Sequence, residues 1–547
     1  MGASRLRKTA KTRKTEASRR QKSVLASGAM KTLASYLGGE WKEGTGKESM
    51  LLDPSTEEIL AKASTEGLDF AAAVRFARER GGPVLRAMSF AARGTILRTL
   101  SRAIHEHRDE LLDLAMANGG NTRSDAKFDV DGASGTLAYY AQLGQELGEQ
   151  RFLIDGEGIQ LGRSPRFVGQ HAVLPRRGVA VHVNAFNFPA WGLGEKLACA
   201  ILGGMPVIVK PATSTAIVAQ RIAELLVATN ALPEGAFQLV AGPPGNLLEH
   251  LGGDDVLSFT GGGNTAATLR AMACVARDSV RVNVEADSLN AAILGPDVEL
   301  GSDTYNAFLR DVARDVTQKT GQKCTAIRRV FVPSDKIDEV VAELCARLKE
   351  VKVGDPRADG VGMGPVATAA QQRDVRDGLD RLAAESIRAL GNGPFEPVGV
   401  PAGKGFFIPA SVFVQKDPDA AKAVHAREVF GPCITVMPAD DAPRVGDLVR
   451  RGGGGLVSSV YTDDRTYAAD VVLEIGSSHG RVFIGSAKIL DQTGGPGTVL
   501  PQTIHGGPGR AGGGEELGGL RGLAFYGQRV AIQGDRPLVD ALLGRSS

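Results

Sequence analysis

The sequence has few cysteines and no long apolar segment. Only five of its 547 residues are cysteine, and none forms a Cys-x-x-Cys pair, so neither a disulfide framework nor a cysteine-based metal or redox site is expected. No segment approaches the roughly 20 consecutive apolar residues that span a bilayer, and the N-terminus lacks the apolar stretch of a secretory signal. We therefore expect a cytoplasmic protein with no metal and no membrane partner.

The sequence also lacks a strong excess of either charge. A formal net charge of +2 gives no reason to expect a nucleic-acid partner for the body of the chain. Residues 1–29 differ, because nine basic residues stand there against the single acid Glu16. This composition predicts a disordered basic tail, with a targeting peptide or a nucleic-acid-binding arm as the alternatives.

Glycine is abundant, and apolar runs recur with α/β periodicity. Seventy glycines indicate many tight turns, and a chain this long needs more than one core because single cores stop growing near roughly 250–300 residues. Apolar positions at three- and four-residue intervals predict a helix from Ser89, its N-cap, to about residue 117. Between residues 178 and 284, short apolar runs alternate with helical patterns, which predicts a parallel, doubly wound sheet. A second alternating region from about 330 to 483 predicts another α/β unit.

One cysteine stands apart from the others. Cys199, Cys274 and Cys345 lie in apolar helical patterns, which predicts that they are small buried hydrophobes. Cys324 instead lies at the edge of an element, directly after a lysine. A nearby cation or a helix N-terminus would lower the pKa of this thiol, so Cys324 is the candidate nucleophile.

Polar residues follow several of the predicted strands, where doubly wound sheets bind ligands. The amide of Asn187 could donate to a developing oxyanion or, more commonly for asparagine, form an Asx turn or helix cap. Glu285 follows the strand 280–284 and could act as a general base, although surface glutamates are far commoner.

Two further strand ends suggest a nucleotide. Lys210 is placed either to bond ribose or phosphate oxygens or to lie solvated at its strand end. Thr260, Gly261 and Gly262 lead into a helix whose first turn could receive a phosphate. No Gly-x-Gly-x-x-Gly fingerprint occurs there, so the usual dinucleotide motif is absent.

Taken together and in this order, the motifs resemble the aldehyde dehydrogenase superfamily from about residue 36 to 533. Each motif alone is weak evidence for this family, whereas all of them together in this order are specific to it. The motifs are Asn187-Phe-Pro, Lys210-Pro-Ala, Phe259-Thr-Gly, Glu285, Gly321-Gln-x-Cys324, Glu428-x-Phe430-Gly-Pro and Glu516-Leu-Gly.

The resemblance implies a role for each catalytic position. Cys324 would attack an aldehyde, and the Asn187 amide with the Cys324 backbone N–H would hold the oxyanion. Glu285 would activate the water that hydrolyses the resulting thioester to a free acid. Glu516 matches a position implicated in proton relay.

The resemblance also implies a nicotinamide cofactor. Lys210 would bond the adenosine ribose, Glu428 the nicotinamide ribose, and Phe430 would pack near the nicotinamide. Many NAD-preferring relatives carry an acid directly after Lys-Pro-Ala, but this chain has Thr213 there, followed by Ser214. Either hydroxyl could donate to a 2′-phosphate, so we expect NADP, with NAD as the alternative.

The implied architecture has three parts. A Rossmann-type cofactor-binding domain would comprise residues 30–156 and 177–284, and an α/β catalytic domain residues 285–522. A small β element for oligomerisation, at residues 157–176 and 523–534, would pair with a second copy in a homodimer.

Two departures point to one branch of the family. The usual Glu-Leu-Gly-Gly is replaced by Glu285-Ala-Asp-Ser-Leu-Asn, and Asn187 follows Asn-Ala-Phe without the frequent tryptophan. These variants resemble the branch that oxidises CoA-linked semialdehydes in aerobic aromatic degradation, which includes the aldehyde dehydrogenase domain of the phenylacetate ring-opening protein. Because the chain ends at Ser547, we expect the stand-alone form, with a substrate such as 3,4-dehydroadipyl-CoA semialdehyde from benzoyl-CoA oxidation.

Three alternatives stay open. The chain could be a CoA-acylating aldehyde dehydrogenase, in which CoA rather than water takes the acyl group. It could be a general NAD-dependent aldehyde dehydrogenase of another substrate class, or a catalytically silent structural relative.

Overall fold

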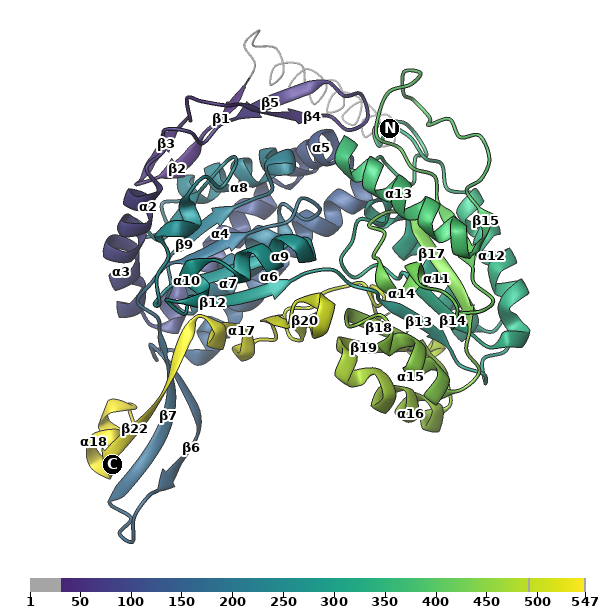
Figure 1. Cartoon of the computed structure of the whole chain (residues 1–547). Coiled ribbons are helices and arrows are strands. Elements are labelled where there is room, and N and C mark those ends of the chain that lie inside the picture. Colours follow the sequence, from purple (N-terminus) through teal and green to yellow (C-terminus); the bar gives the residue numbers. More distant parts are fainter. Residues whose placement is uncertain (1–30, 490–491, 546–547) are drawn as a thin grey trace, which may run out of the picture.

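A computed structural model of the chain describes residues 31–489 and 492–545, so the predicted basic tail at residues 1–29 lies outside the described residues. Figure 1 shows two α/β lobes side by side and an arm of three strands that projects from the first lobe. No helix within the described ranges is long and apolar enough to cross a membrane.

The first lobe is built on a seven-stranded sheet. Its strands are β2 (Ser35–Leu37), β3 (Glu40–Lys42), β8 (Ala180–Val183), β9 (Val207–Lys210), β10 (Phe237–Leu239), β11 (Val256–Thr260) and β12 (Arg281–Glu285). They lie in the order β12-β11-β8-β9-β10-β2-β3, and β8 to β12 are parallel. The chain runs outward from β8 through β9 to β10 and then returns to β11 and β12 on the other side. The predicted doubly wound sheet is thus confirmed, and its switch point lies between β8 and β11.

Helices cover both faces of this sheet. They are α2 (Phe70–Phe76), α3 (Gly82–Ala87), α4 (Phe90–Glu106), α5 (Arg108–Gly119), α6 (Arg123–Leu147), α7 (Trp191–Leu202), α8 (Ala216–Ala228), α9 (Gly263–Arg270) and α10 (Ala273–Ala276). Ser89 caps α4 as predicted, accepting a bond from the Ala92 N–H. The single helix predicted from Ser89 to about 117 is wrong, because His107 adopts φ −104° and ψ 19° and separates α4 from α5.

The second lobe repeats the α/β pattern, as predicted. Its strands are β13 (Ala291–Leu294), β14 (Arg329–Val332), β15 (Ile387–Leu390), β16 (Ser411–Val414), β17 (Cys433–Pro438), β18 (Gly455–Tyr461) and β19 (His479–Gly485). Their order is β15-β16-β17-β14-β13-β18-β19, with only β15 antiparallel to its neighbour. The helices of this lobe are α11 (Asp303–Thr317), α12 (Ile337–Lys349), α13 (Ala369–Glu385), α14 (Ala423–Ala426), α15 (Ala442–Arg450) and α16 (Arg465–Ile475).

Three smaller units complete the fold. The arm consists of β6 (Leu153–Gln160), β7 (Phe167–Pro175) and β22 (Gly527–Asp535), with α18 (Arg536–Leu542) after its last strand. A small sheet contains β1 (Thr32–Leu33), β4 (Ser49–Leu52) and β5 (Ile59–Ala63). A hairpin of β20 (Ile504–Gly507) and β21 (Gly514–Leu517), followed by α17 (Leu520–Phe525), lies between the two lobes (Figure 1). Because the hairpin contacts β12 of the first sheet and β18 and β19 of the second, it ties the two lobes together where their strands end.

Candidate active site

Two cavities meet at the ends of the first sheet's strands. A cavity of about 480 Å³ is lined by aromatic side chains of α6 and α7 together with His505 of the hairpin. A wider one of about 1740 Å³ extends past the start of α9 toward the second lobe. The residues that line both cavities are Ala185, Asn187, Thr260, Glu285 and Cys324. The predicted nucleophile, oxyanion donor and base therefore lie together at the junction.

The loop before Cys324 is held in an unusual backbone conformation. Lys319, Thr320 and Gly321 all have positive φ, at 52°, 58° and 67°. Gly321 is required there, because a Cβ at this position would lie 2.2 Å from the carbonyl oxygen of Gly431. After the loop, the Asn290 amide donates to the carbonyl of Cys324 at 2.8 Å. These contacts fix the nucleophile's backbone on both sides.

The thiol itself lies in an environment that the sequence did not predict. Cys324 is partly exposed, whereas Cys199, Cys274 and Cys345 are buried as expected. The neighbouring Lys323 points away from the sulfur and pairs with Asp315 at 2.6 Å. Burial and then the adjacent Glu285 carboxylate raise the pKa of Cys324. The expectation that a neighbouring cation lowers this pKa is therefore wrong for Lys323, whose charge is already paired.

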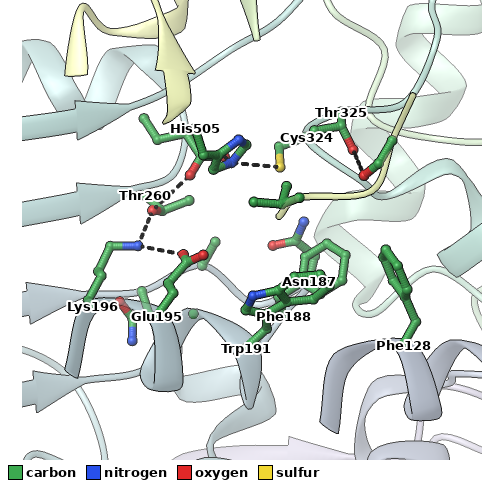
Figure 2. A pocket seen from close by; sticks show the side chains of 16 residues that line it. Phe128, Asn187, Phe188, Trp191, Glu195, Lys196, Thr260, Cys324, Thr325 and His505 are labelled. Atoms are coloured by element: carbon green, nitrogen blue, oxygen red, sulfur yellow. Dashed lines mark hydrogen bonds and ion pairs between the residues drawn. The ribbon is translucent and has the colours of Figure 1, made fainter. Parts of the chain in front are cut away.

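Glu285 is a buried carboxylate rather than a surface one. It is the last residue of β12 and is 2% exposed. Its Oε1 lies 3.2 Å from His505 Nε2. The same nitrogen of His505 lies 3.9 Å from the Cys324 sulfur (Figure 2). Burial alone would raise the pKa of Glu285, but the facing His505 and Lys196 lower it, while Glu285 overcomes burial to raise the pKa of His505. Both shifts favour the pair of a carboxylate and an imidazolium.

A line of polar contacts leads away from Glu285. Thr260 Oγ1 donates to Glu285 Oε2 at 3.4 Å and accepts from Lys196 Nζ at 2.9 Å. Lys196 also lies 3.1 Å from Glu195 and 3.1 Å from Glu516, as Figure 2 shows in part. Burial would lower the pKa of Lys196, but the Glu516 and Glu195 carboxylates raise it. A cation is thus held between the candidate base and Glu516.

Glu516 is fixed at the far end of this line. Its Oε1 accepts bonds from Ser258 Oγ at 2.9 Å and from the Asn283 amide at 3.0 Å. Both donors lie on the neighbouring strands β11 and β12. The sheet therefore holds the carboxylate in a defined position beside Lys196.

Asn187 points at the nucleophile's loop. Its Nδ2 donates to the carbonyl of Gln322 at 3.1 Å, and a carboxamide nitrogen carries a second N–H that can bond another acceptor. The helix-cap alternative does not hold, because α7 is capped at Ala190 and its Trp191 N–H bonds Asp129 instead.

The wide cavity has the groups that a nucleotide needs. Thr260, Gly261, Gly262, Glu428 and Phe430 line it, as do the first residues of α9. Gly262 caps α9, and a Cβ built on it would meet no atom within 4 Å, so there is open space beside the helix terminus, although the Asp287 carboxylate already accepts the Gly263 N–H. These residues fit a dinucleotide in chemistry and in space.

Two of these groups have defined surroundings. Glu428 accepts the Ser288 N–H at 2.9 Å and pairs with Arg328 at 3.4 Å, and burial raises its pKa to about 7. Phe430 packs edge-on against Phe186 with the ring centroids 6.0 Å apart. Asp287 bonds the Gly263 N–H at 3.0 Å and so carries a negative charge to the same helix terminus.

Three predicted cofactor residues lie beside the wide cavity rather than in its lining. Lys210 ends β9, and Thr213 and Ser214 follow in a short 3₁₀ turn. Ala212, between them, does line the cavity. Lys210 is 9% exposed, and burial lowers its pKa to about 8.

Sequence reasoning missed three residues of the site: Glu195, Lys196 and His505. All twelve residues of α7 are buried, so an adjacent acid and base in an otherwise apolar helix was the available signal. His505 is one of only eight histidines and precedes two glycines in a short strand. That context gives no local sign of a catalytic role.

Within the described ranges, two clusters have ligand atoms spaced closely enough for a metal ion. They are Glu285 with Cys324 and His505, and Glu195 with Glu285 and Glu516. In the first cluster, His505 pairs with Glu285. In the second cluster, Lys196 pairs with Glu195 and Glu516. Ion pairing accounts for both arrangements.

Comparisons with known proteins identify the family of the chain. The profile of the aldehyde dehydrogenase family matches residues 41–529. The chain is 42% identical over 477 residues to 3,4-dehydroadipyl-CoA semialdehyde dehydrogenase of Aromatoleum evansii, a match that covers 87% of this chain and 93% of that protein. The resemblance expected from the motifs is confirmed.

Solved structures show the same fold. The NAD+ complex of an aldehyde dehydrogenase from Bacillus cereus superposes with a TM-score of 0.81 at 23% identity, covering 94% of this chain and 98% of its own. Betaine aldehyde dehydrogenase from Staphylococcus aureus, in complex with NAD+, gives 0.80 at 24% identity, with 94% and 96% covered. The chain belongs to the aldehyde dehydrogenase family and is an oxidoreductase.

Proposed function

We propose that this enzyme oxidises a CoA-linked semialdehyde, such as 3,4-dehydroadipyl-CoA semialdehyde, to the carboxylic acid with NADP as the oxidant. The observation that carries the chemistry is the junction of the two cavities, where Cys324, Asn187 and Glu285 meet. The similarity to the Aromatoleum evansii enzyme supports the substrate class.

In the first half-reaction, Cys324 adds to the aldehyde carbon. The second N–H of the Asn187 amide and the Cys324 backbone N–H stabilise the oxyanion of the thiohemiacetal. A bound nicotinamide would supply the hydride acceptor for this carbon, and Cys324 would then hold the acyl group as a thioester. The pocket walls keep this reactive centre away from bulk water, because aromatic rings surround it on the substrate side.

In the second half-reaction, Glu285 takes a proton from the water that attacks the thioester. Thr260 and Lys196 then connect Glu285 to Glu516, so the proton has a route out of the site. Transfer of the acyl group to a thiol does not need this base. The placement of Glu285 therefore favours hydrolysis over the CoA-acylating alternative.

The cofactor preference rests on the turn after β9. Thr213 and Ser214 offer hydroxyl donors where an acid would repel a 2′-phosphate, and Lys210 adds a cation nearby. Glu428 would bond the nicotinamide ribose, and Phe430 would pack beside the ring.

The substrate cavity suits an uncharged acyl chain. Phe128, Phe188 and Trp191 pack edge to face with centroids 5.1–6.0 Å apart and form one wall. An apolar wall of this kind accepts a linear carbon chain ending in an aldehyde and leaves the polar CoA portion outside the cavity.

The arm supports a homodimer as the working form. One edge of β22 carries no strand within the described residues, since the arm sheet has the order β22-β7-β6. Such an edge can pair with the same arm or with another sheet of a second copy. Sedimentation of the enzyme would test this, and a monomer would contradict it. The cytoplasmic location stays a prediction.

A substrate panel tests the proposed function. Free and CoA-linked semialdehydes of equal chain length are compared with NAD and with NADP, and products are identified by mass spectrometry. We expect the CoA-linked substrate with NADP to give the highest kcat/KM and a free acid as product. Formation of a new acyl-CoA only when free CoA is added would contradict hydrolysis, and equal rates with free aldehydes would contradict the CoA-linked class.

A further inference from the structure

The Cys324 thiol and the Glu285 carboxylate create an electrostatic conflict. Both groups line the junction of the two cavities, Glu285 buried and Cys324 partly exposed, and each must carry a negative charge at one stage of the reaction. Burial and Glu285 raise the pKa of Cys324, so the thiolate is disfavoured while the carboxylate beside it is ionised. A cation that faces both groups would resolve the conflict.

His505 is placed to be that cation. Its Nε2 lies 3.9 Å from the Cys324 sulfur and 3.2 Å from Glu285 Oε1, so one ring nitrogen faces both anionic sites. Its imidazole is 3% exposed. The two nearby lysines have other partners. Lys196 contacts Thr260, Glu195 and Glu516 rather than the sulfur. Lys323 is paired with Asp315.

We propose that His505 is a catalytic residue whose imidazolium is the shared counter-ion of Cys324 and Glu285. It stabilises the Cys324 thiolate before attack and the Glu285 carboxylate during hydrolysis. This assignment rests on the proposed function in taking Cys324 as the nucleophile.

The proton balance of the first step is simple. The S–H bond of Cys324 breaks, its electron pair stays on sulfur, and its proton forms an O–H bond on Glu285. His505 stays protonated throughout, so the site exchanges one anion for another without changing its net charge. When sulfur attacks the aldehyde, the negative charge passes to the substrate oxygen. Glu285 then returns to its carboxylate form in a concerted relay: its proton passes to Thr260, the Thr260 hydroxyl proton passes to Lys196, and Lys196 gives one of its own ammonium protons to Glu516.

The charges around His505 favour its protonated form. Glu285 faces it from β12 and Glu195 from α7, and both raise its pKa, whereas burial and Arg481 of β19 lower it. The sum of these effects is a raised pKa. The surrounding carboxylates thus favour the imidazolium form of His505 beside the Cys324 sulfur.

Alkylation of Cys324 by iodoacetamide tests this role without substrate or cofactor. The rate is followed from low to high pH by mass spectrometry of the Cys324 peptide. In His505→Gln, which keeps a polar side chain but cannot be charged, we expect the rate at neutral pH to fall about tenfold or more and the profile to move to higher pH. A rate profile that coincides with that of the parent enzyme would overturn the proposal.

Two controls separate charge from structure. His479→Gln removes another buried imidazole, one bonded to Ser458 and the Ile475 carbonyl outside the cavity, and should leave the profile unchanged. In His505→Ala, added imidazole should restore the alkylation rate, and this variant also serves if the glutamine variant does not fold. Absence of rescue in a folded His505→Ala enzyme would count against the counter-ion role.

The alkylation result is independent of the substrate. If Cys324→Ala keeps normal turnover, the proposed function fails first. If Cys324→Ala is inactive but His505→Gln alkylates like the parent enzyme, only the role of His505 fails.

Discussion

On the substrate side of Cys324 the walls are aromatic rings and buried ion pairs, whereas the wider cofactor side combines the glycines at the start of α9 with polar and charged side chains of the second lobe. The substrate side holds its charges in fixed pairs, such as Glu285 with His505 and Lys196 with Glu516. Charges buried in this way are strongly coupled, so changing one partner leaves the other uncompensated. Cofactor binding depends more on open space. Single substitutions on the cofactor side should therefore change the affinity for the cofactor rather than abolish the reaction.

Removing the thiol should have the largest effect. Cys324→Ala is expected to lower dehydrogenase activity by at least about 10³-fold, because no other group at the junction can form the covalent intermediate. Cofactor affinity, measured by calorimetry, should stay within about twofold of the parent value. Near-normal turnover by this variant would contradict the assignment of Cys324 as the nucleophile.

Removing the base should stop the reaction halfway. Glu285→Gln is expected to give a burst of about one NADPH per site, slower than in the parent enzyme because the amide cannot take the Cys324 proton, and then a steady rate about 10²–10⁴-fold below that of the parent enzyme. Stopped-flow absorbance would show the burst, and mass spectrometry would show the acyl group on Cys324. A variant that cycles without a burst would require a different base.

A smaller effect is expected at the far end of the proton route. Glu516→Gln should lower kcat about tenfold and also slow the burst, because Glu516 receives the proton that Glu285 releases in both half-reactions. The matched control is Glu515→Gln, since Glu515 is exposed on the same strand and should be silent. Equal effects of the two substitutions would remove Glu516 from the route.

On the cofactor side, affinity for NADP should depend on pH. Burial lowers the pKa of Lys210 to about 8, so its ammonium is charged below that pH and loses its charge as the pH rises through it. NADP affinity should be constant below pH 8 and fall by up to about tenfold per pH unit above it. Lys210→Arg should flatten the profile because guanidinium stays charged. A flat profile in the parent enzyme would place the Lys210 ammonium away from the phosphate.

The smallest expected change concerns cofactor choice. Thr213→Glu should move the ratio of kcat/KM values toward NAD by about tenfold, because a carboxylate repels a 2′-phosphate and accepts a bond from a 2′-hydroxyl. The activity with saturating NAD should be kept. An unchanged ratio would show that residue 213 does not face the 2′-position.

The sequence predicted the cofactor lobe well because its signal is local. Apolar runs such as 207–209 are buried on both faces, and their alternation with helices leaves little choice of topology. Asn187, Glu285 and Cys324 were found because each lies in a short motif. The break at His107 was missed, since the apolar spacing continues through it.

The charges of the site were not predictable in the same way. His505 is 181 residues from Cys324 along the chain, and Glu516 bonds partners more than 230 residues away. Such contacts exist only after both lobes and the hairpin are assembled. The raised pKa of Cys324 follows from that assembly and not from its neighbours in sequence.

The hairpin between the lobes limits where this enzyme can tolerate insertions and deletions. His505 and Glu516 are direct partners in the β20–β21 ladder, so their side chains emerge on the same face of the ribbon. Inserting or deleting one residue in either strand would turn one of them to the opposite face. Length variation should therefore be confined to the turn at residues 508–513, where the ribbon can grow without separating the imidazole from its carboxylate neighbour. Strand pairing thus couples the positions of the two side chains, although eleven positions separate them in the chain.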